Sequence, residues 1–194
     1  MGKKPKTVMF RRKREGKTNY KKRLALLKSG KSRLSVRKSN KNITAQIIGY
    51  KVGGDVILLS VRSNNLKKYG WKLSKNNLPA AYLLGLLIGK KAVKSGIKEA
   101  ILDMGMRIST KGSKIYALVK GAADSGLDVP YSEEIMPAEE RIKGKHIESY
   151  AEKLKGDEKK FSKQFSGYLK NKVDVKAVEK HFEEVKKKIG GLNE

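Results

Sequence analysis

Positively charged side chains near the start of the chain are the residues best suited to chemistry in this sequence. Two short runs stand out: residues 11–14, Arg-Arg-Lys-Arg, and residues 20–23, Tyr-Lys-Lys-Arg. A guanidinium group offers a planar set of donors that fits phosphate oxygens, and both arginine and tyrosine can stack on a nucleic-acid base. These residue types therefore indicate binding to a polyanion, and nucleic acid in particular.

The excess positive charge is concentrated at the amino-terminal end. The chain has 194 residues, and its 46 Lys and Arg against 19 Asp and Glu leave a net charge of +27. Residues 1–50 hold 17 of those cations and a single acid, Glu15. A charge that served only solubility would be spread along the chain, so the pattern favours a phosphate-binding arm. A disordered basic tail without a specific target is the alternative.

Other features argue against a membrane protein or a secreted one. The most apolar stretch, Leu78 to Gly89, has twelve residues, whereas a helix needs about 20 to span a bilayer. The basic start is not followed by the apolar segment of a signal peptide. Cysteine is absent, which excludes disulfides, thiolate zinc sites and a thiol nucleophile. We therefore expect an intracellular protein whose charge is neutralised by nucleic acid.

No constellation of residues supports catalysis. The two histidines, His146 and His181, lie in polar segments without a partner at metal-ligand spacing. Asp103 lies in an apolar segment and precedes Asp124 and Asp128, which could suggest a carboxylate metal site. A structural hydrogen bond to an arginine or a helix end is the favoured explanation for Asp103. We predict no enzyme, no cofactor and no metal; a metal-dependent nucleic-acid enzyme remains an alternative.

The elements that must position the cations begin with a short helix. Thr18 is expected to cap it, and Gly30 is expected to end it in a left-handed conformation. Tyr20, Leu24 and Leu27 share one face of this helix. That face is expected to dock on the protein while the other presents the cations.

A period-two pattern behind this helix predicts a β-sheet. Leu34 and Val36 alternate with polar residues, and short turns separate the segments 43–48 and 56–61. Three strands joined by short turns predict an antiparallel meander. Residues 100–104, Ala-Ile-Leu-Asp-Met, are expected to add a fourth strand.

Two apolar helices, one opening at Asn77 and one running from about Ser113 to Gly126, are expected to cover the sheet. Gly85 and Gly89 are four residues apart in the first of these helices, which permits a close backbone approach. A phosphate loop is rejected there because the glycine spacing is one residue short and no Ser or Thr follows the lysine. The order strand-strand-strand-helix-strand-helix predicts an α/β (α+β) fold with a mixed sheet of about four strands.

Beyond Pro130 the pattern predicts three polar helices with narrow apolar stripes. The third is expected to be capped by Asp174 and ended by Gly190 and Gly191. Such stripes suit docking on a surface rather than forming a separate core. They are Ile147, Tyr150, Ala151 and Leu154; Phe161, Phe165, Tyr168 and Leu169; and Val178, Phe182, Val185 and Ile189. The chain thus divides into a basic arm (1–30), an α/β core (31–130) and a helical C-terminal extension (131–194).

Several blocks of sequence, in register over residues 5–155, match a known family. They are Arg33 to Ile43 with Gln46-Ile47, Tyr69 to Lys72, Asn77 to Leu87, Ala100 to Gly105, Leu118 to Leu127 with Pro130, and Pro137 to Gly144 with His146-Ile147. In these blocks the chain resembles large-subunit ribosomal protein eighteen, the 5S-rRNA-binding family, in its archaeal and eukaryotic form.

The resemblance implies a structural role in the cytoplasmic ribosome. It implies binding to 5S rRNA, contact with the large-subunit rRNA, and a place in the central protuberance of the large subunit. It also implies large-subunit protein five as a protein neighbour. Composition by itself indicates only the preference for a polyanion. A protein-interaction module outside the ribosome, using the helical tail, is the other alternative.

The residues expected to bind RNA lie in the arm and around the first strand. They are Arg11, Arg12, Lys13, Arg14, Tyr20, Lys21, Lys22, Arg23, Arg33, Arg37, Lys38, Asn40 and Lys41. Asn40 can read a base edge or a ribose hydroxyl, whereas a lysine mainly meets phosphate. Trp71 could stack on RNA, but an anchoring role in the core is slightly favoured.

Overall fold

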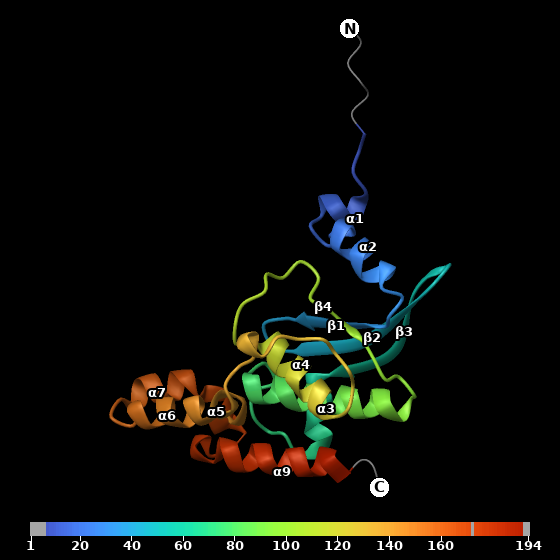
Figure 1. The fold of residues 1–194 in the computed structure, drawn as a ribbon. Helices are drawn as coiled ribbons and strands as arrows, with labels where there is room; N and C mark the ends of the chain where they lie inside the picture. The colour runs from blue at the N-terminus through green and yellow to red at the C-terminus, as the bar shows by residue number, and fades with distance from the viewer. Residues whose placement is uncertain (1–6, 172, 192–194) are drawn as a thin grey trace.

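A mixed β-sheet runs through the middle of the molecule, with helices on one side and the amino-terminal arm on the other (Figure 1). The computed structural model describes residues 7–171 and 173–191. Within them the strands are β1 (Arg33–Lys38), β2 (Ile43–Lys51), β3 (Gly54–Arg62) and β4 (Ile101–Asp103). Their order is β3-β2-β1-β4, antiparallel except for the parallel pair β1–β4. The α+β class and the predicted meander plus one strand are confirmed.

The two faces of the sheet differ because side chains alternate along each strand. Leu34 and Val36 of β1 pair with apolar residues of β2 and are buried. Arg33, Ser35 and Arg37 alternate with them and therefore point to the opposite face. The sheet thus has an apolar face for the core, and β1 presents charged and polar side chains on the face turned towards the arm.

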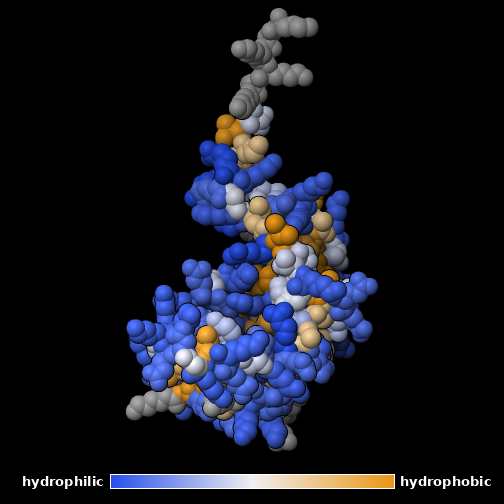
Figure 2. Space-filling model, turned by 90° about the vertical axis from the view of Figure 1, so that its left-hand side faces the viewer, coloured by the Kyte–Doolittle hydropathy of each residue, from blue (hydrophilic) through white to orange (hydrophobic). Residues whose placement is uncertain are grey.

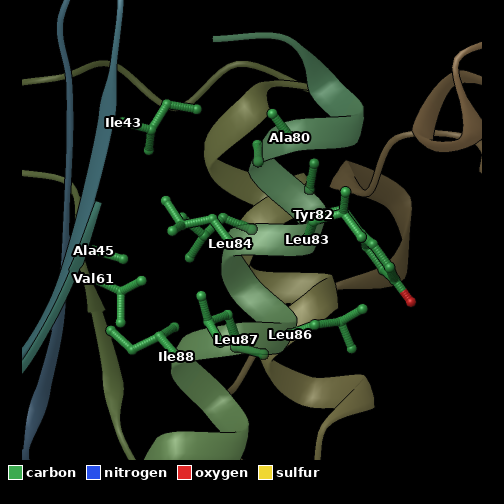
Figure 3. Packing of buried hydrophobic residues seen from close by; sticks show 14 of the residues in the cluster. Ile43, Ala45, Val61, Ala80, Tyr82, Leu83, Leu84, Leu86, Leu87 and Ile88 are labelled. Carbon is green, nitrogen blue, oxygen red and sulfur yellow. The ribbon is translucent and has the colours of Figure 1, made fainter. Parts of the chain in front are cut away.

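The apolar face is covered by α3 (Leu78–Lys94) and α4 (Lys114–Asp124). Figure 3 shows Ala45 and Val61 of the sheet directed at Leu84 and Ile88 of α3. All four side chains belong to the same buried cluster. Burial of an aliphatic side chain stabilises the fold by about 1.5–3 kcal/mol, so this layer is the main source of stability.

α3 begins where the sequence predicts, at Asn77, whose Oδ1 accepts a hydrogen bond from the Ala80 N–H at 2.9 Å. α3 and α4 then approach backbone to backbone. A Cβ placed on Gly85 would lie 2.0 Å from the Leu118 carbonyl oxygen, and one on Gly121 would lie 2.2 Å from that of Tyr82. The close approach predicted at Gly85 is confirmed, and Gly121 is its counterpart in α4.

The connecting and C-terminal segments are mostly short helices. They are the 3₁₀ helices η1 (Ser63–Tyr69), η2 (Glu133–Ile135) and η3 (Val175–Ala177) and the α-helices α5 (Glu139–Lys143), α6 (Lys145–Lys153), α7 (Glu158–Gln164), α8 (Ser166–Lys170) and α9 (Val178–Gly190). No helix in the described ranges is long and apolar enough to cross a bilayer.

α9 packs against the main core on α3. Its predicted stripe, including Phe182, is buried, and the Phe182 ring lies 5.6 Å from that of Tyr82. The expectation that the C-terminal stripes dock on a surface is therefore correct for α9, and the surface is the protein's own core. For the other stripes it is wrong in part, because Ala151, Phe165 and Val175 form a small separate cluster.

Two details of the C-terminal helices differ from the prediction. The expected helix through residues 161–169 is split, because α7 ends and α8 begins on either side of Phe165, which is buried. The third helix starts directly after Asp174 as η3, and its α-helical part, α9, starts only after Ala177. At Phe165, tertiary burial overrides the local helical pattern.

Candidate nucleic-acid interface

The arm folds into α1 (Arg11–Arg14) and α2 (Tyr20–Lys28). The N-cap of α2 is Asn19, whose side chain accepts a hydrogen bond from the Lys22 N–H at 3.1 Å. The predicted cap, Thr18, is wrong by one residue because its hydroxyl accepts a hydrogen bond from Arg12 Nε at 2.9 Å. The predicted left-handed end at Gly30 is confirmed by its φ of +68°.

α2 does not dock through the apolar face that its sequence suggests. None of its residues is fully buried, and Leu24 is 57% exposed. Tyr20 packs instead against Phe10 of the arm, with ring centroids 5.3 Å apart. Leu24 and Tyr20 are therefore wrongly predicted as docking residues, because the arm is joined to the sheet chiefly through charged side chains.

A cleft of about 570 Å³ lies between the arm and the charged face of the sheet. Figure 2 shows the arm projecting from the body, and hydrophilic residues predominate on the side in view. The charged residues that line the cleft are Arg12, Lys17, Lys22, Arg23, Arg33, Arg37, Asp55 and Asp103. Six cations against two acids make the cleft a basic site, suited to a phosphate backbone.

Arg23 links the arm to the sheet through Asp55 of β3. Its Nη1 and Nη2 donate to the two carboxylate oxygens of Asp55 at 2.6 and 2.7 Å. Arg33 Nη2 donates to the same carboxylate at 2.6 Å, and Arg33 Nη1 lies 3.5 Å from Asp103 Oδ2. Arg37 completes the row, because its Nη2 lies 3.2 Å from Asp103 Oδ1. We call these five residues the ion-pair network.

The network fixes the ionisation of Asp55. Hydrogen bonds donated by Arg23 lower the pKa of its carboxyl to about 2 despite partial burial, and Arg33 adds to the effect. The same contact raises the pKa of Arg23. Both groups are therefore charged at neutral pH, and the arm is held by a two-pronged ion pair.

Asp103 has the structural role that the sequence favours. Besides its contacts with Arg33 and Arg37, it accepts a hydrogen bond from the Gly105 N–H at 2.8 Å. Asp124 accepts one from the Tyr82 hydroxyl at 2.7 Å, so the two carboxylates serve different parts of the fold. Across residues 7–171 and 173–191 no group of three or more His, Asp or Glu could hold a metal ion.

Arg33 is buried, whereas a side chain that binds RNA is expected to be exposed. It is 2% exposed and its guanidinium lies between two carboxylates, so it supports the interface from beneath. Burial of a charge is tolerated here because both acids compensate it.

Trp71 is buried as favoured, with Nε1 donating to the Ser74 carbonyl at 3.0 Å, and cannot stack on RNA.

The other expected residues fall into two groups. Those whose side chains have neither an ion pair nor a hydrogen bond among the described residues lie on the arm, at the end of β1 and in the β1–β2 turn: Lys13, Arg14, Lys21, Lys22, Lys38, Asn40 and Lys41. Arg11 pairs with Glu15 at 3.9 Å, and Arg37 keeps 48% of its side chain exposed. Together these side chains leave many donors free for an external anion.

Sequence reasoning missed Asp55 and Asn76. Asp55 is one of only two acids in the first 98 residues, and that scarcity is the signal that could have identified it. Asn76 Nδ2 donates to the carbonyls of Ser39 and Asn40 at 2.9 Å each, which fixes the turn that carries Asn40. No local pattern announces this second contact, because it joins segments far apart in the chain.

Comparison with known proteins gives two consistent matches. The model of a family described as "Ribosomal large subunit proteins 60S L5, and 50S L18" matches residues 4–99 and 94–132. A curated relative, "Large ribosomal subunit protein uL18" of Methanococcus maripaludis, is 51% identical over 185 residues. The alignment covers 95% of this chain and 96% of that protein.

Proposed function

From the premise that this chain belongs to the family of large-ribosomal-subunit proteins 60S L5 and 50S L18, we propose that it binds 5S rRNA and helps to attach it to the large rRNA. Membership makes it a structural component of the large subunit of the cytoplasmic ribosome and not an enzyme. The finer role, at the central protuberance and beside large-subunit protein five, is part of the proposal. This neighbour is the other 5S-rRNA-associated protein and is distinct from the 60S L5 of the family description.

The observation that carries the proposal is the basic arm held over the uncovered side of the sheet. Helices bury the apolar face, whereas the opposite face offers a basic cleft with free cations around it. Lysine and arginine donors of this kind bind phosphates, and a side-chain amide such as that of Asn40 can contact a base or ribose. The particular RNA is inferred from the sequence blocks shared with the 5S-rRNA-binding family.

A competition experiment tests the choice of RNA. The purified protein is incubated with labelled 5S rRNA, and either unlabelled 5S rRNA or a scrambled RNA of equal length is added. We expect only the unlabelled 5S rRNA to displace the probe at moderate salt. Equal displacement by both RNAs would reduce the proposal to general RNA binding.

The protein neighbour is tested separately. Large-subunit protein five is added to the complex of the protein with 5S rRNA, and co-sedimentation is measured. We expect a ternary complex in which each protein binds the RNA more tightly than it does without the other protein. Independent binding of the two proteins would argue against direct contact between them.

A further inference from the structure

Asp55 is an acid in a surface that otherwise favours anions. A carboxylate beside phosphates is repelled by them, and its presence lowers the positive potential of the cleft. If charge alone governed RNA binding, loss of this acid would raise the affinity. Its position between Arg23 and Arg33 therefore calls for a role that outweighs the repulsion.

The contacts of the arm indicate that role. Within residues 7–30, Arg23 is the residue that forms hydrogen bonds or an ion pair with the body of the protein, and its partner is Asp55. Leu26 and Ile48 line the cleft between them, but no residue of α2 is buried. The orientation of α2 over the sheet therefore depends on this one bidentate ion pair.

Asp55 is itself rigidly held. It lies at the start of β3, next to the β2–β3 turn, and the hairpin rises beside α2 (Figure 1). Its Oδ1 also accepts a hydrogen bond from Arg33, whose side chain is 3% exposed and is fixed from the other side by Asp103. The carboxylate can therefore act as a fixed anchor for a helix that has no other polar attachment among the described residues.

We propose that Asp55 is a positioning residue that fixes the arm over the charged face of the sheet, so that this acid strengthens the binding of a polyanion. The proposal rests on the proposed function, because RNA is the ligand for which the arm is held. A fixed arm has fewer degrees of freedom to lose on binding, and this preorganisation raises the affinity. The gain exceeds the repulsion because the carboxylate's charge is already neutralised by two arginines.

The test compares Asp55→Asn with Asp128→Asn. Asp128 is an exposed acid outside the ion-pair network, so its replacement removes the same charge without touching the arm. We expect Asp55→Asn to raise the Kd for 5S rRNA about tenfold, corresponding to the cost of ordering a freed segment. Asp128→Asn should leave the Kd unchanged or lower it slightly. An Asp55→Asn protein that binds as tightly as Asp128→Asn, or more tightly, would overturn the proposal.

Arg23→Lys provides a second variant that keeps both the net charge and the Asp55–Arg33 contact. Lysine cannot form the bidentate pair, so the affinity should fall as it does for Asp55→Asn. If both changes break one contact, their effects must not add in the double variant. Additive effects would mean that Arg23 contacts the RNA directly, and the proposal would be wrong.

Hydrogen exchange in the free proteins supplies a measurement independent of RNA. Amides of α2 should exchange faster in Asp55→Asn and Arg23→Lys, while those of α3 should not change. Faster exchange with an unaltered Kd would reject the positioning role and leave the proposed function intact. Equal binding of 5S and scrambled RNA by the wild-type protein would instead reject the proposed function. In that case the effect of Asp55→Asn on the affinity for RNA in general would still decide the positioning role.

Discussion

At the scale of single residues, the charged side chains of this protein have two different tasks. Lys13, Arg14 and Lys21 have no ion-pair partner among the described residues and can meet an external anion. Arg33 and Asp103 are mostly buried and satisfy each other and their neighbours. Sequence composition counts both kinds alike, but only the first kind has charged groups left free for an external anion.

Asp103→Asn tests the structural task. The change removes the negative charge beside the buried guanidinium of Arg33 while keeping an acceptor for the Gly105 N–H. Loss of a charged hydrogen-bond partner at a buried site costs about 1–3 kcal/mol, so the melting temperature should fall. The Kd for RNA should change by less than about threefold once the protein is folded, since ~0.6 kcal/mol corresponds to that factor. Lost RNA binding with an unchanged melting temperature would assign Asp103 to the interface itself.

The pH dependence of Asp55 tests the ion pair with Arg23. The pKa of its carboxyl is lowered from 3.8 to about 2, so the pair stabilises the folded protein above the ordinary pKa. That stability disappears as the pH falls from about 4 through about 2. The carboxyl carbon of Asp55, followed by NMR, should titrate near 2 in the wild type and nearer 3.8 in Arg23→Lys. Identical midpoints in the two proteins would contradict the bidentate contact.

At the scale of elements, the α3–α4 contact holds the layer that supports the sheet. Two helices can approach this closely only where side chains are absent, and Gly85, Gly89 and Gly121 provide those places. The neighbouring groups at Gly85 and Gly121 are backbone carbonyls and amides, which cannot move aside without displacing a helix. The charged face of the sheet is therefore held in place by packing on its far side.

Gly85→Ala should destabilise the protein because the new Cβ would lie 2.0 Å from the Leu118 carbonyl oxygen. Overpacking of this kind typically costs about 1–3 kcal/mol. Gly167→Ala in α8 is a matched control, since nothing lies within 4 Å of its Cβ and alanine favours a helix by about 1 kcal/mol. Thermal unfolding should show a lower melting temperature for the first variant and an equal or higher one for the second. Equal melting temperatures would show that the helices can separate at little cost.

At the scale of the whole molecule, the fold separates the charged arm from the hydrophobic core. Among the residues that the structure describes, the core cluster contains none before Leu34, and α1 and α2 contain no buried residue. The arm and the core meet through the ion-pair network and a cleft rather than through a shared apolar layer. The division into an arm (1–30), a core (31–130) and an extension (131–194) is a proposal that this separation supports for the arm.

Deletion of residues 1–30 should leave a folded protein, because every residue of the main core is retained. It removes 12 of the 46 Lys and Arg, so the affinity for 5S rRNA should fall about a hundredfold or more at moderate salt. Circular dichroism checks the fold, and a gel shift checks the binding. The isolated arm should bind RNA weakly and with little sequence preference, since it must become ordered on contact. Full affinity in the truncated protein would move the main RNA-binding surface to the sheet.

Binding should also depend steeply on salt. If about six to ten phosphates are contacted and the salt dependence is that of B-DNA, the affinity should fall by about three to five orders of magnitude between 50 and 200 mM salt. For irregular RNA the fall should be somewhat smaller. Filter binding over this range measures the slope. A nearly flat response would refute the electrostatic account of the interface.

The sequence by itself determined the elements and the kind of partner. Hydrophobic periods of two and of three to four identify the strands and the helices α3, α4 and α9, because each pattern reflects which side of a local element is buried. The concentration of cations before residue 50 indicates a polyanion, and the shared sequence blocks identify the family.

Only the tertiary structure decided which cations are free. Arg23 and Asp55 are 32 positions apart, and Arg37 and Asp103 are 66 apart. Contacts over such distances leave no periodic trace in the sequence, because they depend on how the strands and the arm are brought together. The same reason explains why Arg33 was expected at the interface and is buried beneath it, and why the docking face of α2 was wrongly predicted.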